Sequence, residues 1–291
     1  MPAFADKSYY PVLLGDVYLN RYKVITKLGY GSNSTVWLSL DQKYNSFVAL
    51  KIYACTSHAL RESRILAELA KIRSQHIGMT AIRPVLDSFG LISEDGNMHV
   101  CLVHPPVLVS PQGFQDLFRY TVLPTTIFRA VIYDILVAIG FLHTKAQMVH
   151  TDIQASNIVL GSKDSSIFEK LLEAEHNNPS ARKTIDKYII YQSQALTLDE
   201  IIDNIGPLYL TDFGEARTRA DGWHGLIQPD PFRSPEVILK MPWTRKTDIW
   251  NLGVMAWRLF EDHLLFSSRD SEGNHSDAQL LAHITAILDP A

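Results

Sequence analysis

The sequence contains little cysteine and no excess of basic residues. Only Cys55 and Cys101 occur among 291 residues, and both lie in apolar runs. This pattern predicts buried free thiols and argues against a disulfide framework or a thiolate metal site. The 27 Lys and Arg residues are outnumbered by 31 Asp and Glu, which gives a formal net charge of −4. Because nucleic-acid binders usually carry a basic excess, we expect no direct binding of nucleic acid.

Signals for membranes and for repeats are also missing. We see no run of about 18 apolar residues, and the N-terminus lacks the basic start and continuous apolar stretch of a signal peptide. There is no internal repeat and no low-complexity tract. We therefore expect no membrane partner and a location in the cytoplasm, the nucleus or both. We also expect a monomer. An apolar content of 46% is sufficient for a sizeable core.

The residue pattern changes near residue 105. Residues 1–20 form a leader with two prolines and little periodicity. The next part favours strands around one amphipathic helix, and the part beyond residue 105 favours helices. The predicted strands are 22–28, 35–40, 47–53, 82–89 and 98–103. The predicted helices are 57–72, 125–143, 168–176, 247–261 and 276–288.

This order predicts an α+β fold in two lobes. The smaller, β-rich N-terminal lobe would span residues 21–104, and the larger, mainly helical C-terminal lobe residues 105–291. A polar segment at about 162–206 interrupts the second lobe and is predicted to be an insertion.

The N-terminal lobe contains residue types that bind phosphate groups. Gly29 and Gly31 lie between two predicted strands, where the absence of side chains lets backbone N–H groups approach a phosphate closely. Val36 follows and would cover a base. Lys51 lies in an apolar strand, which is costly for an ammonium group unless it is paired, and Glu62 on the following helix is the natural partner.

Each of these features has a simpler interpretation when taken alone. A Gly-x-Gly sequence is common in tight hairpins, and a lysine at the end of a strand often lies at the surface. The order of the features, with the glycines first, then the strand lysine and then the helix glutamate, is the order that phosphate binding requires.

The C-terminal lobe contains a matching set of acidic and amide residues. Asp152 precedes Asn157 by five residues, and Asp212 opens an Asp-Phe-Gly triplet. One carboxylate can orient an attacking hydroxyl and accept its proton, while the amide and the second carboxylate hold Mg²⁺ against phosphates. An ordinary solvated acid is the simpler interpretation of Asp152. The order of these residues and of Ser234-Pro235-Glu236 along the chain argues against it.

These motifs resemble those of the eukaryotic protein kinases, and more narrowly those of the serine/arginine-rich protein kinases in their fungal branch. The narrower resemblance lies in Lys27–Gly31, His150-Thr151-Asp152, Asp212–Arg217 and Arg233–Leu239, and it extends from about Tyr10 to the C-terminus. It implies a bilobal protein-kinase-like fold in which the last helices of the C-terminal lobe are missing.

The resemblance also implies a function. The chain would be a protein serine/threonine kinase that transfers the γ-phosphoryl group of ATP, with Mg²⁺ as cofactor, to protein substrates rich in arginine and serine. Lys51 would contact the phosphates and Glu62 would pair with it. Asp152 would be the base, and Asn157 and Asp212 the metal ligands.

The nucleotide pocket follows from the same resemblance. Its implied residues are Gly29, Gly31, Val36, Ala49, Lys51, Pro105 and Val107. Alignment with the family hinge puts His104 at the gatekeeper position, where it precedes a Pro105 carbonyl and a Val107 N–H that could bind adenine. Proline cannot donate a hydrogen bond, but the first of these contacts needs only an acceptor.

One departure leaves an alternative open. Gln154 stands where most of these kinases have a lysine that contacts the γ-phosphate, and an amide supplies no charge there. A nucleotide-binding pseudokinase or scaffold with weak or no catalysis is therefore the alternative function. A small-molecule phosphotransferase is a third option, against which Arg233-Ser234-Pro235-Glu236 and Asp248-Ile249-Trp250 argue.

Two further predictions concern acidic residues of the C-terminal lobe, first Asp248 and then a group of four acids. Asp248 is predicted to cap its helix and, by the family resemblance, to hold the backbone of the loop around Asp152. Four acids could attract basic substrates or could simply be a solvated face. They are Asp262, Asp270, Glu272 and Asp277.

Overall fold

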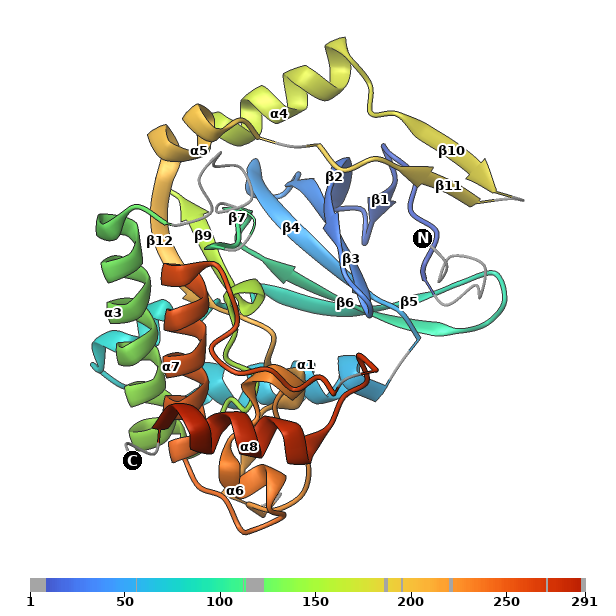
Figure 1. Ribbon diagram of the computed structural model, residues 1–291. Coiled ribbons are helices and arrows are strands. Elements are labelled where there is room, and N and C mark those ends of the chain that lie inside the picture. The colour runs from blue at the N-terminus through green and yellow to red at the C-terminus, as the bar shows by residue number, and fades with distance from the viewer. Residues whose placement is uncertain are drawn as a thin grey trace. The chain divides into compact units, whose positions relative to one another are not determined.

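Alternating apolar residues in the N-terminal third build a six-stranded antiparallel sheet, in the order β1-β2-β3-β4-β6-β5 (Figure 1). The structure, a computed structural model, describes residues 9–55, 57–111, 113, 123–185, 188–194, 196–219, 222–270 and 272–288. The strands are β1 (Val17–Tyr18), β2 (Tyr22–Tyr30), β3 (Ser34–Asp41), β4 (Ser46–Tyr53), β5 (Asp87–Ile92) and β6 (Met98–His104). The strand predicted at 82–89 begins only at Asp87, since Pro84 cannot donate to a ladder.

The chain divides into two units. The first contains Met1–Lys71, Arg83–Val109 and Leu160–Pro207, and the second contains Ile72–Ile82, Ser110–Val159 and Leu208–Ala291. The division predicted from the sequence assigned the segment 162–206 to the C-terminal lobe. In the structure most of this segment belongs to the first unit and packs with the N-terminal strands instead.

The register of the sheet decides which residues share a face. Val36 is opposite Lys51, and Ala49 is opposite both Leu38 and His104. Because side chains alternate along a strand, these residues lie on one face of the sheet. The other face carries the larger apolar side chains. Its buried cluster contains Val24, Trp37, Val48, Leu50, Ile52, Cys101 and Val103.

The two cysteines differ in their surroundings. Cys101 is buried in this cluster, as predicted, whereas Cys55 is exposed, and both are free thiols. Cys55 follows the end of β4, where the chain turns toward helix α1 (Ser57–Lys71). The prediction that both thiols are buried is therefore wrong for Cys55, because the apolar run continues past the last residue of the strand.

The polar segment after residue 160 forms a helix and a hairpin of its own beside the sheet (Figure 1). Its elements are β9 (Ile158–Ser162), α4 (Ser166–Asn177), β10 (Arg182–Ile185), β11 (Tyr188–Tyr191), α5 (Leu198–Asn204) and β12 (Ile205–Leu210). The predicted helix 168–176 is confirmed. Ile167, Phe168 and Leu171 on α4 form a buried cluster with Ile25 and Leu38. An apolar stripe on one face of α4 therefore directs this segment onto the strands.

A buried carboxylate holds the same segment to β2. Glu175, 9% exposed, accepts hydrogen bonds from Thr26 Oγ1 at 2.7 Å, from Ser180 N at 2.8 Å and from Gln194 Nε2 at 3.0 Å. Burial opposes ionisation of this carboxyl, but the hydrogen bonds from Ser180, Thr26 and Gln194 outweigh burial and lower its pKa.

Stability should therefore depend on the ionisation of Glu175. Its pKa is lowered in the folded protein, so the unfolded chain binds a proton first as pH falls, and the stabilisation is lost on acidification below the ordinary value of about 4.5. We expect Glu175→Gln to be less stable than the parent at neutral pH, with a difference that shrinks as pH falls. Denaturant unfolding at several pH values measures this, and a difference that is constant or grows on acidification would contradict it.

The second unit is predominantly helical. Its elements are η2 (Ile77–Ala81), α3 (Thr125–Phe141), a π-helical turn η3 (Leu142–Ala146), β8 (Met148–Val149), η4 (Ala155–Asn157), η5 (Phe213–Glu215), β13 (Arg217–Thr218), η7 (Asp230–Phe232), α6 (Pro235–Ile238), α7 (Lys246–Glu261) and α8 (Asp277–Leu288). Pro124 is the N-cap residue of α3. Gly78 packs so closely on α3 that an added Cβ would collide with the backbone of Val137, so only glycine fits there.

One prediction about membranes needs correction. The segment Thr125–Ala146 is 22 residues long with a mean hydropathy of 1.8, which is enough by length and composition to cross a bilayer. The core helix of a soluble protein meets the same criteria, and Val131, Ile135 and Ala138 on α3 are buried within the unit. The polar residues scattered along the helix hid this segment from a search for continuous apolar runs.

Candidate active site

Lys51 and Glu62 form a buried ion pair inside the first unit. Lys51 Nζ lies 2.9 Å from Glu62 Oε2, and the two side chains are 11% and 1% exposed. Tyr53 Oη also donates to Glu62 Oε2, and the Lys51 ammonium lies 4.8 Å from the centre of the Tyr53 ring. Strand β4 supplies the lysine and the tyrosine, and α1 supplies the glutamate. The pairing predicted from the sequence is confirmed.

The glycine loop joins β2 to β3. Gly29 is opposite Val36, and Gly31 N donates to Ser34 O at 2.8 Å. A Cβ added at Gly29 or at Gly31 would meet no atom of the described residues within 4 Å. Packing of the described residues therefore does not demand glycine at these two positions, which is consistent with a bound group approaching the backbone there.

The residues aligned with the hinge are held by a neighbouring segment that the sequence analysis did not identify. Arg83 Nη2 donates to Pro105 O at 2.9 Å, and His104 Nδ1 lies 2.8 Å from Pro84 O. Since a carbonyl can only accept, Nδ1 of His104 carries the proton. Burial lowers the pKa of His104, and the charge of Arg83 adds to this, so its ring is neutral. The Pro105 carbonyl expected to bind adenine thus already accepts one hydrogen bond.

Val107 lies in the short strand β7 (Val107–Val109). It is opposite Gly161 of β9. Ala49 is fully buried at the centre of the sheet. These positions are compatible with the nucleotide pocket implied by the resemblance. In that pocket Ala49 would contact the adenine base, and the backbone N–H of Val107 would donate a hydrogen bond to it.

In the second unit, Asp152 is surrounded by the amides predicted to act with it. Gln154 Nε2 donates to Asp152 Oδ1 at 2.9 Å, and Asn157 Nδ2 donates to Asp152 Oδ2 at 2.7 Å and to its backbone oxygen at 2.9 Å. Thr211 N donates to Asn157 O at 2.9 Å, which brings the following Asp212 beside this loop. The loop therefore gathers Asp152, Gln154, Asn157 and Asp212 in one place.

The electrostatics of this cluster suit a cation. Burial raises the pKa of the Asp152 carboxyl against the effects of His150 and of the hydrogen bonds from Asn157 and Gln154, which lower it, and the negative charge of Asp212 adds a smaller increase. Asp212 adopts a left-handed backbone with φ of 65°. One carboxylate and one amide oxygen are a sparse set of protein ligands, as Mg²⁺ uses when substrate phosphates and water complete its shell. Among the described residues no group of three or more His, Cys, Asp or Glu could hold a metal by itself.

A buried aspartate on α7 holds the backbone of the loop that carries Asp152. Asp248, 0% exposed, accepts from His150 N at 2.9 Å and from Thr151 N at 2.8 Å, and lies 2.8 Å from His143 Nε2. These bonds support Thr151 in a left-handed conformation with φ of 68°, which is strained for a β-branched residue. The predicted role of Asp248 in holding the loop is confirmed, while the predicted helix cap is wrong, since α7 begins two residues earlier.

Replacing Asp248 should be strongly destabilising. We expect Asp248→Ala to lower the free energy of unfolding by roughly 3–5 kcal/mol, because buried donors would lose their acceptor. Denaturant unfolding measures the loss. Glu261→Ala, at an exposed position on the same helix, is the control and should change stability by no more than about 0.5 kcal/mol. A loss below about 1 kcal/mol for Asp248→Ala would contradict this role.

His150 has a structural environment. It is 0% exposed, its Nε2 lies 3.1 Å from Thr211 O, and its ring meets Phe213 edge to face at 4.9 Å. These contacts connect the loop that carries Asp152 with the segment that carries Asp212.

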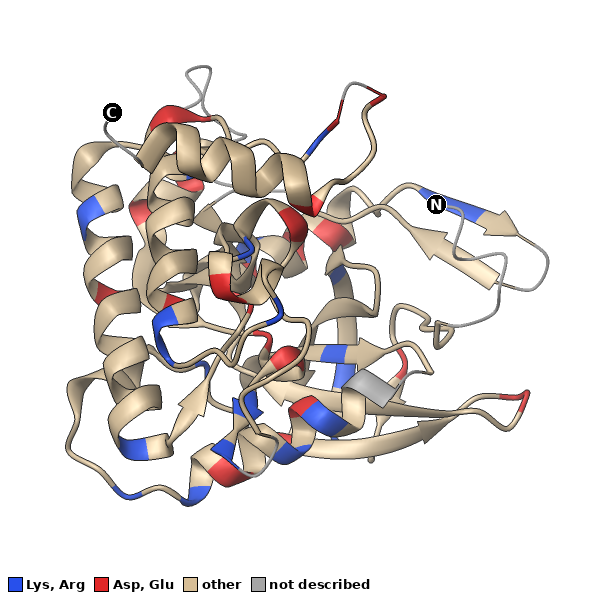
Figure 2. Ribbon diagram, turned by 60° about the horizontal axis from the view of Figure 1, so that its bottom comes forward, with Lys and Arg blue, Asp and Glu red and all other residues tan. Residues whose placement is uncertain are grey.

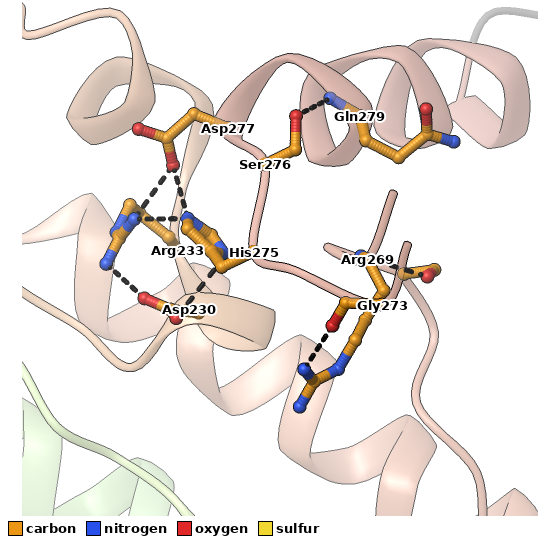
Figure 3. A network of polar contacts seen from close by, with 9 residues as sticks. Asp230, Arg233, Arg269, Gly273, His275, Ser276, Asp277 and Gln279 are labelled. Atoms are coloured by element: carbon orange, nitrogen blue, oxygen red, sulfur yellow. Dashed lines mark hydrogen bonds and ion pairs between the residues drawn. The ribbon is translucent and has the colours of Figure 1, made fainter. Parts of the chain in front are cut away.

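Arg233, which directly precedes Ser234-Pro235-Glu236, organises a second polar network (Figure 3). Arg233 Nη2 lies 2.6 Å from Asp230 Oδ1, and Arg233 Nη1 lies 2.8 Å from Asp277 Oδ1. His275 bridges the same two carboxylates, at 3.3 Å and 2.9 Å. The network ties the segment before Ser234-Pro235-Glu236 to the start of α8.

Two of the acids proposed to attract basic substrates have structural roles. Asp277 belongs to the Arg233 network, and Asp270 Oδ1 accepts from the backbone of Glu272 and Asn274, both at 2.9 Å. Figure 2 shows acidic and basic residues mixed over the helices of the second unit. Asp277 and Asp270 thus have partners within the second unit, and the attraction of basic substrates by these acids stays a prediction.

A comparison with known proteins now decides the family. The model of the protein kinase domain matches residues 22–187 of the chain. The chain belongs to the protein kinase family. The matched part covers the glycine loop, the Lys51–Glu62 pair and the loop that carries Asp152 and Asn157.

Relatives of this kinase agree with the assignment. A serine/threonine protein kinase of Aspergillus fumigatus is 40% identical over 291 residues, which covers 100% of this chain and 70% of the relative. A serine/threonine-protein kinase SRPK of Physarum polycephalum is 28% identical, covering 97% of this chain and 70% of its own. SRSF protein kinase 3 of Mus musculus is 32% identical over 62% of this chain and 34% of its own. The chain is a protein serine/threonine kinase.

A solved structure shows the same fold. A crystal structure of a kinase domain matches 98% of this chain and 75% of its own, with a TM-score of 0.70 and 23% identity. The predicted protein-kinase fold, with a β-rich N-terminal lobe and a helical C-terminal lobe, is confirmed.

Proposed function

We propose that this kinase transfers the γ-phosphoryl group of MgATP to serine or threonine in arginine- and serine-rich protein segments. The observation that carries the proposed chemistry is the Asp152 carboxylate, which Gln154 and Asn157 hold by hydrogen bonds of 2.9 Å and 2.7 Å beside Asp212. The proposed substrate class is supported by the relatives named as SRPK and SRSF protein kinases.

The proposed reaction is a substitution at phosphorus. The substrate hydroxyl oxygen forms a bond to the γ-phosphorus, the bond from that phosphorus to the bridging oxygen of ADP breaks, and the hydroxyl proton passes to Asp152. When bound, Mg²⁺ would neutralise charge on the phosphates, with Asn157 and Asp212 as its protein ligands. Lys51, held by Glu62, would contact the phosphates. The hydrogen bonds from Gln154 and Asn157 orient the Asp152 carboxylate toward the substrate hydroxyl.

Gln154 is the residue behind the second candidate, a kinase-like protein that binds nucleotide with weak or no transfer, which the family match and the relatives do not support. Its amide bonds Asp152 but brings no positive charge to the γ-phosphate. Both candidate functions include nucleotide binding, but only the first includes transfer of the phosphoryl group.

The test measures both properties on the same preparation. Transfer of ³²P from γ-labelled ATP is measured on a serine/arginine-repeat peptide, on the same peptide with lysine for arginine, and on one with alanine for serine. Binding of MgATP is measured by thermal shift. We expect transfer to the first peptide, weaker transfer to the second and none to the third. Binding without transfer would favour the second candidate, and equal transfer to the first two peptides would contradict the substrate class.

A further inference from the structure

The leader residue Tyr9 reaches the tip of the glycine loop. Its hydroxyl lies 2.8 Å from Gly31 O and 2.6 Å from Ser32 O, and its side chain is buried, with 8% exposed. Burial raises the pKa of Tyr9, so the hydroxyl keeps its proton and is the donor to these carbonyls. No motif in the sequence indicates this contact, which spans more than 20 positions along the chain.

The segment that carries Tyr9 is firmly attached to the sheet. Val12 is buried in the apolar cluster of the sheet, and the Tyr10 ring packs against Tyr18 and His99 at 6.0 Å and 5.4 Å. A few residues further on, Gly15 N donates to Val24 O at 2.9 Å. Tyr9 is therefore held by a fixed support, so its hydroxyl can restrain the Gly31 and Ser32 carbonyls, while the next carbonyl, Asn33 O, accepts from Ala54 N at 2.8 Å.

The restraint determines where the loop amides point. In a trans peptide the carbonyl and the following N–H point in opposite directions. Since Gly31 O and Ser32 O point toward Tyr9, the N–H groups of Ser32 and Asn33 point away from it. Neither N–H donates to another described residue, and both residues are exposed. Two backbone donors at the tip of the loop are thus oriented in advance and available to an anion.

We propose that Tyr9 is a positioning residue for nucleotide phosphates, acting through the Gly31 and Ser32 carbonyls to present the Ser32 and Asn33 amides. The inference rests on the proposed use of ATP at this site. It gives the leader an indirect part in nucleotide affinity, through the glycine loop. Removing the hydroxyl allows the two peptide groups to rotate, so phosphate binding weakens while the base and ribose are bound as before.

The test compares nucleotides with and without phosphates. We expect Tyr9→Phe to weaken MgADP and MgATP binding about five- to tenfold, the loss of one well-formed hydrogen bond, and to leave adenosine binding unchanged. In transfer assays KM for ATP rises by a similar factor, while kcat changes less than twofold. Tyr10→Phe, on the same segment, is the matched control and should change neither affinity.

The outcomes separate this inference from the proposed function. Equal weakening of adenosine and MgADP in Tyr9→Phe would indicate a general structural role and would overturn the inference, as would unchanged affinity for both. If the parent protein binds no MgATP at all, the proposed function fails first. Melting temperatures of both variants confirm that the comparison is made on folded protein.

Discussion

Replacing Asp152 by asparagine is expected to reduce phosphoryl transfer by roughly 10²–10⁴-fold, the range for loss of a general base. The two side chains have the same shape, so the loop should keep its fold. The amide cannot accept the proton of the attacking hydroxyl. Its NH₂ group would also face either the Gln154 or the Asn157 amide, each of which donates to the carboxylate in the parent protein.

The measurement is kcat for ³²P transfer, together with MgATP affinity by thermal shift. We expect kcat to fall and the affinity to remain within a factor of a few. Asp199→Asn, at an exposed position on α5, controls for the loss of a negative charge elsewhere and should retain full activity. A variant Asp152→Asn that keeps more than one-tenth of the parent rate would exclude Asp152 as the base.

The second large effect is expected from Lys51→Met. Methionine has a similar length but no charge, so the phosphates lose a cation in a buried site and transfer should fall by roughly 10²–10³-fold. Stability should fall as well, since the Glu62 carboxylate, 1% exposed, would lose its lysine 2.9 Å away.

A second substitution separates these two effects. Adding Glu62→Gln to Lys51→Met removes the buried charge and should recover most of the lost stability without recovering transfer. Unfolding by denaturant and kcat are measured on the same three proteins. Recovery of transfer in the double variant would show that Lys51 acts only by keeping the fold, and normal transfer in Lys51→Met would contradict a role on the phosphates.

Strand and helix positions were predictable wherever the local pattern is strong. The strands around Lys51 and the helices 57–72 and 247–261 appear close to their predicted bounds, because period-two and period-3.6 patterns are local properties. Errors lie where one residue overrides the pattern. Pro84 delays the start of β5, and the polar residues of α3 hid its overall apolar character.

The residues of the candidate site were also predictable, because their types and order along the chain carry the chemistry. Lys51 and Glu62 were paired from the sequence, and Asp152, Asn157 and Asp212 were grouped from it. Their catalytic roles stay predictions, to be tested by the variants above. What the sequence could not show is how the group is supported, since the bonds to Asp248 join residues about 100 positions apart in the chain.

The sequence by itself determined the family motifs, the pattern of strands and helices, and the residues expected to bind the phosphates and to catalyse phosphoryl transfer. Only the tertiary structure decided that the segment 160–207 packs on the N-terminal strands, that Arg83 binds the Pro105 carbonyl and that Tyr9 holds the glycine loop. The physical reason is the range of the interactions. Periodicity arises between near neighbours, whereas the hydrogen bond from Thr26 to Glu175 spans 149 positions and exists only once the chain has folded.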